Sequence, residues 1–223
     1  LKAKDREGLL SRHHALFEQM HTDHGVTHFY FLDAARVCLL RVHKPEKFGD
    51  RIDRFTARKA ERTGQASAGI ELGPLGTFTL RVVRPVFENG ERLGYVELGK
   101  EIENILQSLH DDPTVELAVT IHKEALNRSQ WESGMRMLDR EPDWNRFSQE
   151  ALIYYSTPRF PEEIDRYVDP GGHTDTDTVK NLSFLNRTWR VVFLPLQDVS
   201  GREVGDMVVM HDVSRMKAAF WRP

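Results

Sequence analysis

Residues Thr77–Gly99, TFTLRVVRPVFENGERLGYVELG, predict the fold of this chain, because they have the pattern of two antiparallel strands joined at Asn89-Gly90. Asn-Gly between apolar runs favours a type I′ turn, which needs positive φ at both central residues. A similar stretch, TWRVVFLPLQDVSGREVGDMVVM, occurs at Thr188–Met210. Both contain Arg-Val-Val, a Pro near the strand end, and a second Gly four residues after the turn Gly (Gly90/Gly94; Gly201/Gly205). This repeat predicts a duplicated α+β module in which each hairpin leads into a helix.

Composition favours a globular protein without internal disulfides. Of 223 residues, 29% are charged and 39% hydrophobic, and the net charge of −3 gives no indication of nucleic-acid binding. Cys38 is the single cysteine. No run of roughly 18 apolar residues and no signal peptide occurs. Because the chain begins at Leu1 without Met, we expect it to be a fragment of a longer protein.

The first half has the pattern of a PAS-like module, with an antiparallel sheet and helices. Apolar spacing predicts a long N-terminal helix that Gly25 ends, and a basic segment with Arg every three to four residues predicts a second helix. The predicted order is helix Leu1–His24, strands His28–Leu32 and Val37–His43, helix Arg51–Thr63, strands Ile70–Leu72 and Phe78–Glu88, the second hairpin strand, and helix Glu101–Leu109.

The second half predicts a related module with a less regular middle. Strands are expected at Thr114–His122 and Glu150–Tyr155, and a short helix with Pro at its start at Pro161–Val168. Lys123–Asp139 is expected to be helical and mostly outside the core, and residues 169–178 to form a polar loop. The second hairpin would then lead into an exit helix, Val213–Phe220.

The segment Leu40–Asp50, LRVHKPEKFGD, and the hairpin ending Gly94–Gly99, GYVELG, resemble the membrane-distal module of double Cache sensor domains. The most similar group is the double sensory domain of two-component kinases, dCache_3. His28-Phe29, Arg81 and Pro85-Val86-Phe87 add to the resemblance, which covers residues 1–105. The second half matches mainly through its hairpin, and residues 124–178 match nothing.

This resemblance implies tandem Cache modules in the extracytoplasmic, periplasmic part of a bacterial receptor held by two transmembrane helices that lie outside this fragment. The expected divisions are residues 1–27, the N-terminal helix; 28–110, the membrane-distal module; and 111–223, the membrane-proximal module. The output would be a histidine kinase, a chemoreceptor signalling domain or a diguanylate cyclase. A homodimer through the N-terminal helices and a signal through the C-terminal helix are also expected.

A candidate ligand site follows from strand parity, which places polar side chains on one sheet face and apolar ones on the other. Cys38, Leu40 and Val42, with Phe78, Leu80 and Val82, are expected to pack on the N-terminal helix. Two arginines on the polar face favour a small, anionic, carboxylate-bearing ligand, because guanidinium binds carboxylate bidentately. Without a ligand, this face would be an outer surface with salt bridges. The predicted ligand-binding residues are Arg41, His43, Lys47, Thr79, Arg81, Tyr95 and Glu97.

The histidines offer a weaker alternative, a metal-binding or metal-sensing module that uses His21, His24 and His28. Surface histidines at a helix end explain the same pattern. A third hypothesis is a ligand-free interaction module. No cofactor is expected.

Catalysis and a second ligand site have less support. No GxSxG, P-loop, HExxH or GxGxxG motif is present, so we expect no enzymatic activity in this fragment, and the resemblance implies a sensor. A second pocket could use Tyr154, Tyr155, Arg187, Trp189 and Asp206, but a second module that only transmits is favoured.

Overall fold

The structure is a computed structural model that describes residues 5–73, 75–109, 112–157, 161–168 and 179–216. The chain divides into two compact units. Unit 1 comprises Leu1–Leu72 and Phe78–Asn104, and unit 2 comprises Gly73–Thr77 and Ile105–Pro223. Each unit is described by itself below.

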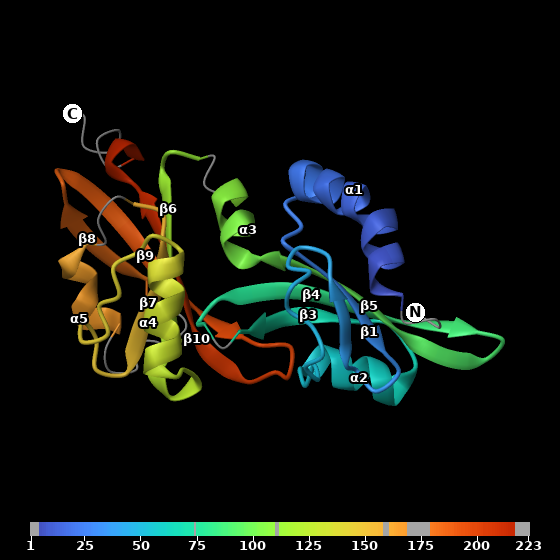
Figure 1. The fold of residues 1–223 in the computed structure, drawn as a ribbon. Coiled ribbons are helices and arrows are strands. Elements are labelled where there is room, and N and C mark those ends of the chain that lie inside the picture. The colour runs from blue at the N-terminus through green and yellow to red at the C-terminus, as the bar shows by residue number, and fades with distance from the viewer. Residues whose placement is uncertain (1–4, 74, 110–111, 158–160, 169–178, 217–223) are drawn as a thin grey trace. The chain divides into compact units, whose positions relative to one another are not determined.

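Unit 1 is a five-stranded antiparallel sheet in the order β2-β1-β5-β4-β3 (Figure 1). Asp5 accepts a hydrogen bond from Gly8 N at 2.9 Å and so caps the N-terminus of α1, and Gly25 ends this helix with a φ of 65°. The elements are α1 (Arg6–His24), β1 (His28–Asp33), β2 (Cys38–Arg41), α2 (Phe55–Thr63), β3 (Ser67–Leu72), β4 (Phe78–Glu88) and β5 (Glu91–Glu101), followed by α3 (Ile102–Leu109).

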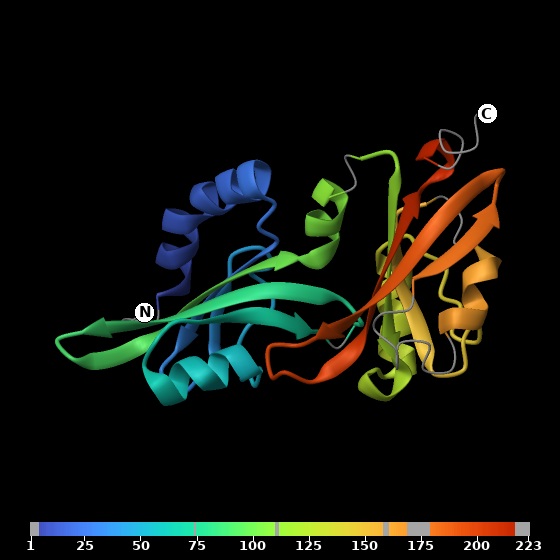
Figure 2. The same cartoon turned by 180° about the vertical axis from the view of Figure 1, so that it is seen from behind.

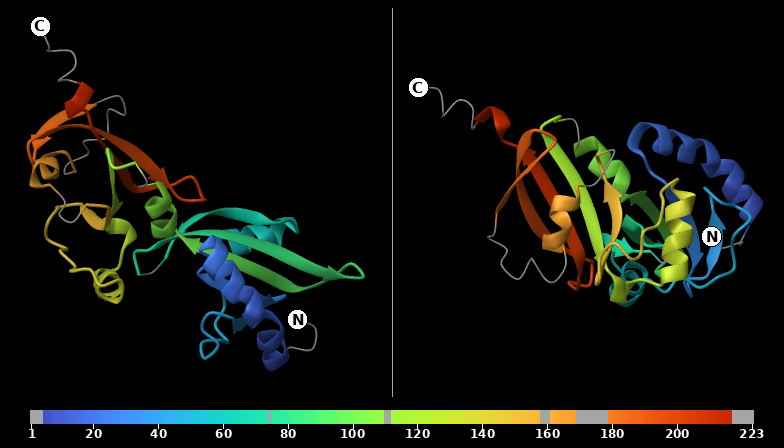
Figure 3. Two further views of the ribbon diagram at one scale, coloured as in Figure 1. Left: turned by 90° about the horizontal axis from the view of Figure 1, so that it is seen from above. Right: turned by 90° about the vertical axis from the view of Figure 1, so that its left-hand side faces the viewer.

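The β4–β5 hairpin forms as the sequence predicted. Asn89 and Gly90 have φ of 51° and 82°, which are the signs that a type I′ turn requires. The tip of this hairpin extends past the helices of unit 1 (Figure 3). Gly94 lies beside a register shift, and a Cβ there would stand 2.1 Å from the Leu32 carbonyl oxygen. Glycine is therefore needed where β5 passes closest to β1.

α1 and α2 lie on opposite sides of this sheet (Figures 1 and 2). Phe17 of α1 packs in an apolar cluster with side chains of β1 and the β2 region, including Phe29 and Leu40. The other face carries a second cluster, which joins Tyr30 and Tyr95 to Ala57 and Ala60 of α2.

Three of the apolar positions do not pack on the N-terminal helix as expected, one because its parity is inverted and two because they are left exposed. A register shift between Phe31 and Leu32 turns Cys38 onto the α2 side, where it packs in the cluster of Tyr30 and Tyr95. Leu80 and Val82 are 36% and 44% exposed, because α1 packs mainly over β1 and the β2 region and leaves β4 uncovered.

The predicted helix Arg51–Thr63 begins later than expected, at Phe55. Arg51 forms an isolated β-bridge with Val37, and Ile52 N donates a hydrogen bond of 2.8 Å to the Arg36 carbonyl oxygen. These contacts hold residues 51–53 extended. Arg54 therefore occupies the N-cap position of α2 instead of a place within the helix.

Unit 2 repeats the topology of unit 1, with its strands in the order β7-β6-β10-β9-β8 (Figure 3). A Cβ on Gly205 would stand 2.0 Å from the Thr120 carbonyl oxygen. Gly94 of unit 1 meets the neighbouring strand in the same way, so the duplication includes this glycine. The elements are β6 (Val115–His122), the 3-10 turn η1 (Lys123–Ala125), α4 (Arg128–Met137), β7 (Glu150–Tyr155), η2 (Glu162–Ile164), α5 (Asp165–Val168), β8 (Lys180–Phe184), β9 (Arg187–Gln197) and β10 (Glu203–Asp212).

Two expectations for unit 2 were incomplete. The segment Lys123–Asp139 does contain helix, but Trp131 and Met135 of α4 are buried, so α4 contributes to the core. The strand β8 was not predicted. Residues 169–178 lie outside the described part, and of the exit helix only residues 214–216 are described, with helical backbone. None of the described helices is long and apolar enough to cross a bilayer.

Candidate functional site

The α2 side of the unit 1 sheet carries six charged side chains that are paired with one another. Register places Glu97 of β5 opposite Tyr30 of β1 and Val83 of β4, and Arg41 of β2 opposite Tyr30, so these side chains share one face. We call the charged set the arginine–carboxylate cluster. Its members are Arg41, Arg54, Arg81, Asp50, Glu71 and Glu97.

Glu97 lies at the centre of this cluster and is fully buried. Its Oε1 accepts a hydrogen bond from Arg81 Nη1 at 2.8 Å and another, shorter one from Arg54 Nη2. Arg81 also donates to Thr79 Oγ1 at 3.2 Å. Within the described residues, Glu97 Oε2 and the Nε atoms of Arg54 and Arg81 are buried and have no hydrogen-bond partner. The cluster thus keeps both an unused acceptor and unused donors.

Glu71 connects the cluster to the start of α2. Its carboxylate accepts hydrogen bonds from Thr56 N at 2.8 Å and Thr56 Oγ1 at 2.9 Å, while Arg54 and Arg81 each bring an Nε to 3.9 Å. The N-cap residue Arg54 makes no side-chain capping bond, so Glu71 of β3 satisfies a helix donor in its place. The N-terminus of α2 is thereby fixed against the sheet.

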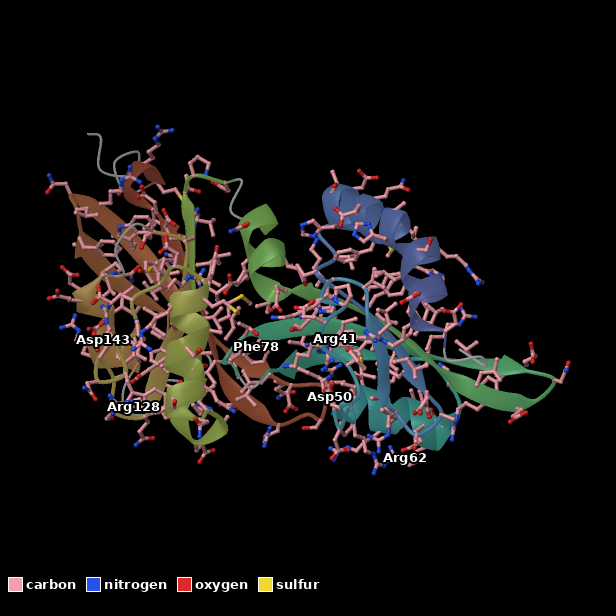
Figure 4. The ribbon with its side chains drawn as sticks, in the orientation of Figure 1. Arg41, Asp50, Arg62, Phe78, Arg128 and Asp143 are labelled. Atoms are coloured by element: carbon pink, nitrogen blue, oxygen red, sulfur yellow. The ribbon has the colours of Figure 1, made fainter. Side chains whose placement is uncertain are left out.

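Arg41 is held by the loop before α2. It forms a bidentate pair with Asp50, two contacts of 2.7 Å, and donates to the Lys47 carbonyl oxygen at 2.7 Å. The Arg41 guanidinium carbon lies 5.1 Å from the centre of the Tyr30 ring, and that of Arg54 lies 5.2 Å from it. Tyr30 therefore joins the two halves of the cluster. Figure 4 shows Arg41 near Asp50, with Arg62 well away on α2.

Two histidines border the cluster without carrying charge at neutral pH. Burial and nearby arginines lower the pKa of His28 to about 3, and burial is the main cause of the lowered pKa of His43, about 4. His43 Nδ1 accepts a hydrogen bond from Phe29 N at 3.1 Å. The ring centres of the two histidines lie 4.8 Å apart. They provide neutral, polar walls beside the arginines.

Five of the seven predicted site residues lie in or beside the cluster, and the side chains of the other two lie outside it. Arg41, His43, Thr79, Arg81 and Glu97 come together as described above. Lys47 is exposed and contributes its carbonyl oxygen. Tyr95 lies in the apolar cluster beside α2, where its hydroxyl is buried without a described hydrogen-bond partner.

Sequence analysis missed three further members of the cluster. Arg54 was predicted only as part of the helix Arg51–Thr63, and Asp50 only as the end of the segment Leu40–Asp50. Glu71 went unnoticed because its contacts are with residues distant in the chain. The available signal was its position. Glu71 lies two residues before the predicted turn and pairs with Thr79, so both side chains share one face.

The cluster is balanced in charge and closed over. Three arginines face three carboxylates, and the Arg54 side chain is the most exposed of the arginines at 25%, against 6–7% for Arg81 and Arg41. Cavities of about 610 and 490 Å³ lie on unit 2, lined by residues such as Arg140 and His122. A ligand at the cluster would therefore have to displace existing contacts. Arg54 is the arginine that solvent, and so a ligand, can reach most easily.

The histidines of the metal hypothesis are not gathered. His21 lies in the last turn of α1 with its Nδ1 2.9 Å from the Val26 carbonyl oxygen, His24 is exposed, and His28 faces Tyr30 and His43. Among the described residues, no group of three or more His, Cys, Asp or Glu side chains has the arrangement that a metal ion needs.

The positions of unit 2 that match the centre of the cluster are apolar, although the buried Asp206 lies on the same face of β10. Counting from Gly94 and Gly205, Glu97 corresponds to Val208, which register pairs with Ala118 and Phe193. These residues, with Trp189 and Val191, belong to one buried cluster. Arg187, in contrast, is half-exposed and pairs with Asp212 at 3.4 Å.

Comparison with known proteins identifies the family. The family model described as double sensory domain of two-component sensor kinase matches residues 1–216. No sequence among the curated proteins matches the chain.

Solved structures with similar folds are distant. The sensor domain of the Vibrio cholerae histidine kinase DctB is 13% identical with a TM-score of 0.49, over 95% of this chain and 81% of that one. A domain of a sensory box/GGDEF family protein from Vibrio parahaemolyticus is 17% identical with a TM-score of 0.48, over 96% and 81%. An extracellular ligand binding receptor from Desulfohalobium retbaense is 12% identical with a TM-score of 0.45, over 90% of this chain but 33% of that one.

The family model covers both units and carries the assignment. It confirms the resemblance that the hairpin and the segment Leu40–Asp50 indicated, and it makes the two units tandem PAS-like Cache modules. The expectation of a sensory, non-enzymatic fragment is confirmed with it. The chain belongs to the family of double sensory domains of two-component sensor kinases.

Proposed function

We propose that this chain is the extracytoplasmic, periplasmic ligand-sensing part of a bacterial transmembrane receptor, and that unit 1 is its membrane-distal, ligand-binding module. The observation that carries the proposal is Glu97, fully buried between two arginines with one oxygen unused. Burying charges costs free energy that an apolar core does not. Unit 2 has such an apolar core at the matched position, so the charges of unit 1 suit recognition better than stability.

The ligand we propose is small and bears a carboxylate. Guanidinium groups select carboxylates through paired hydrogen bonds, and the Nε atoms of Arg54 and Arg81 are unused donors. Because the cluster already balances its charges, a ligand with an ammonium group as well adds no net charge. That group would bind Glu97 Oε2. A zwitterion such as an α-amino acid therefore fits better than a simple anion.

Binding would couple to the fold through Arg54. A ligand carboxylate that takes a guanidinium from Glu97 changes the contacts of Arg54 and Arg81 with Glu71, which caps α2. Differential affinity for the two arrangements would shift their populations. The change would continue through β5 and α3 to the C-terminal helix, and from there to a kinase, chemoreceptor or cyclase output.

The test is a thermal-shift screen with three probe classes: α-amino acids, dicarboxylates and amines without a carboxylate. A probe at 100 times its dissociation constant stabilises the folded state by about 2.7 kcal/mol. We expect an amino acid to raise the melting temperature of the wild type, and calorimetry to show loss of its binding in Arg81→Ala.

Arg84→Ala is the matched control, because Arg84 lies on β4 but is exposed on the opposite face. We expect it to bind as the wild type does. Binding that survives Arg81→Ala would overturn the proposed site. Binding of dicarboxylates in place of amino acids would keep the site and overturn the zwitterionic ligand.

We also propose that the receptor signals as a homodimer through its N-terminal helices. The dimer interface would include the exposed side of α1, where Leu16 is 46% exposed. Sedimentation of wild type and Leu16→Glu would test it, with Phe87→Glu on the exposed hairpin as control. A monomeric wild type at all accessible concentrations would contradict this part of the proposal.

A further inference from the structure

Glu101 is the last residue of β5, at the point where α3 begins. Its Oε1 accepts a hydrogen bond from Thr79 Oγ1 at 3.2 Å, and its backbone N donates to Thr27 Oγ1 at 3.2 Å. Within the described residues, Oε2 is buried and has no hydrogen-bond partner. An ionised carboxylate with an unpaired buried oxygen is costly, whereas the neutral acid costs much less.

The charged and titratable groups around Glu101 do not provide a partner cation. His28 of β1 brings Nδ1 to 3.7 Å, but its pKa of about 3 leaves the ring neutral. Arg81 of β4 is bonded to Glu97 and Thr79. Glu103 of α3 adds a like charge. The surroundings of Glu101 therefore suit a neutral carboxyl group.

We propose that Glu101 is a proton-binding site that gives this sensor domain a second input, separate from the small ligand. The protonated carboxyl fits the buried end of β5. The ionised carboxylate is drawn out toward solvent, and this movement loosens the junction of β5 with α3. Low pH thus favours the closed junction of β5 with α3, and high pH favours the open one.

The titration falls in a range that a bacterium meets. Burial raises the pKa of Glu101 to about 7, against the opposing effects of the Arg81 charge and the Thr79 hydroxyl. Between the ordinary value of 4.5 and about 7 the folded state binds more protons than the unfolded state. The free energy of unfolding therefore falls as pH rises through this window and levels off above it.

Carbon-13 NMR of glutamate-labelled protein tests the proton site without any ligand. Over about pH 5 to about pH 9 we expect one carboxyl carbon to titrate with a pKa far above the ordinary glutamate value of 4.5. That resonance should be absent from Glu101→Gln, which resembles the neutral acid. It should remain in Glu91→Gln, at the exposed start of the same strand. Titration of every glutamate near the ordinary value, or a high midpoint that persists in Glu101→Gln, would overturn the proposal.

Amide hydrogen exchange tests the opening of the junction. After correction for the chemical effect of pH, exchange of residues 102–109 should speed up in the wild type as Glu101 ionises. It should stay slow in Glu101→Gln, and Glu91→Gln should follow the wild type. Equal pH dependence in all three proteins would overturn the switch. Should Glu101→Gln fail to fold, the carbon titration and the hydrogen exchange of the wild type still test the proposal, because a wild type without a high titration midpoint or without pH-dependent exchange would overturn it.

Discussion

The central positions of one sheet face carry charges in unit 1 and apolar side chains in unit 2, where Asp206 is a buried acid on the same face. Glu97 lies where Val208 lies, Tyr30 where Ala118 lies, and Arg81 where Val191 lies. Strand order and the tightly packed glycine are the same in both. The fold therefore does not require charges at these three positions, because unit 2 fills them with apolar side chains.

The comparison supports the proposal that unit 1 carries the recognition surface. Replacing buried ion pairs by well-packed apolar residues is often neutral or stabilising. A cluster of six charges is then better explained by what it binds than by what it adds to stability. Two predictions use matched positions in the two units to test this comparison, and a third tests the Arg41–Asp50 pair of unit 1.

The largest effect is expected for Glu97→Ala. It leaves Arg54 and Arg81 without their shared carboxylate, and breaking a buried ion pair by removing one partner costs about 3–5 kcal/mol. Val208→Ala in unit 2 removes only apolar contacts and should cost about 2 kcal/mol. Urea unfolding of both variants measures the difference. An equal loss of unfolding free energy in the two variants would mean that Arg54 and Arg81 do not depend on Glu97 for their pairing.

A smaller effect is expected for Gly94→Ala and Gly205→Ala, and it should be larger at Gly94, because its φ of 154° also disfavours a side chain. Each added Cβ would stand about 2 Å from a backbone oxygen of the neighbouring strand, Leu32 in unit 1 and Thr120 in unit 2. Overpacking of this kind costs about 1–3 kcal/mol. Thermal unfolding should show both variants destabilised, with Gly94→Ala destabilised more. A loss of stability in only one of the two variants would contradict the structural equivalence of the two hairpins.

The smallest effect is expected for Asp50→Asn, because Asp50 is half-exposed. The Arg41 guanidinium lowers the pKa of Asp50, so the stabilisation it provides is present above the ordinary value of 3.8 and is lost as pH falls through the lower folded value. Solvent screening limits the loss at neutral pH to less than about 1 kcal/mol. Acid unfolding of wild type and Asp50→Asn should converge at low pH. A constant difference at every pH would show that the ion pair is not its cause.

Local signals explain what the sequence could predict. Asn89-Gly90 specifies its own turn, and alternation along β4 and β5 placed Thr79, Arg81 and Glu97 on one face correctly. The duplication was visible because both hairpins need the same glycine.

Long-range contacts explain what the sequence could not predict. The shift at Phe31/Leu32 inverted the parity of Cys38, and the Val37–Arg51 bridge delayed α2 and placed Arg54 at the cluster. Neither has a local signature. Glu71 and Asp50 reach the site through partners on other elements, which a single sequence does not identify.

The central claim is that the cluster of unit 1 binds the ligand. Nitrogen-15 NMR of the arginine Nε–H groups, recorded while the ligand found by the screen is titrated, tests it most directly. We predict that the signals of Arg54 and Arg81, assigned with Arg54→Lys and Arg81→Lys, shift in step with saturation, while that of Arg84 stays in place. Saturation of binding with the Arg54 and Arg81 signals unchanged would contradict the claim.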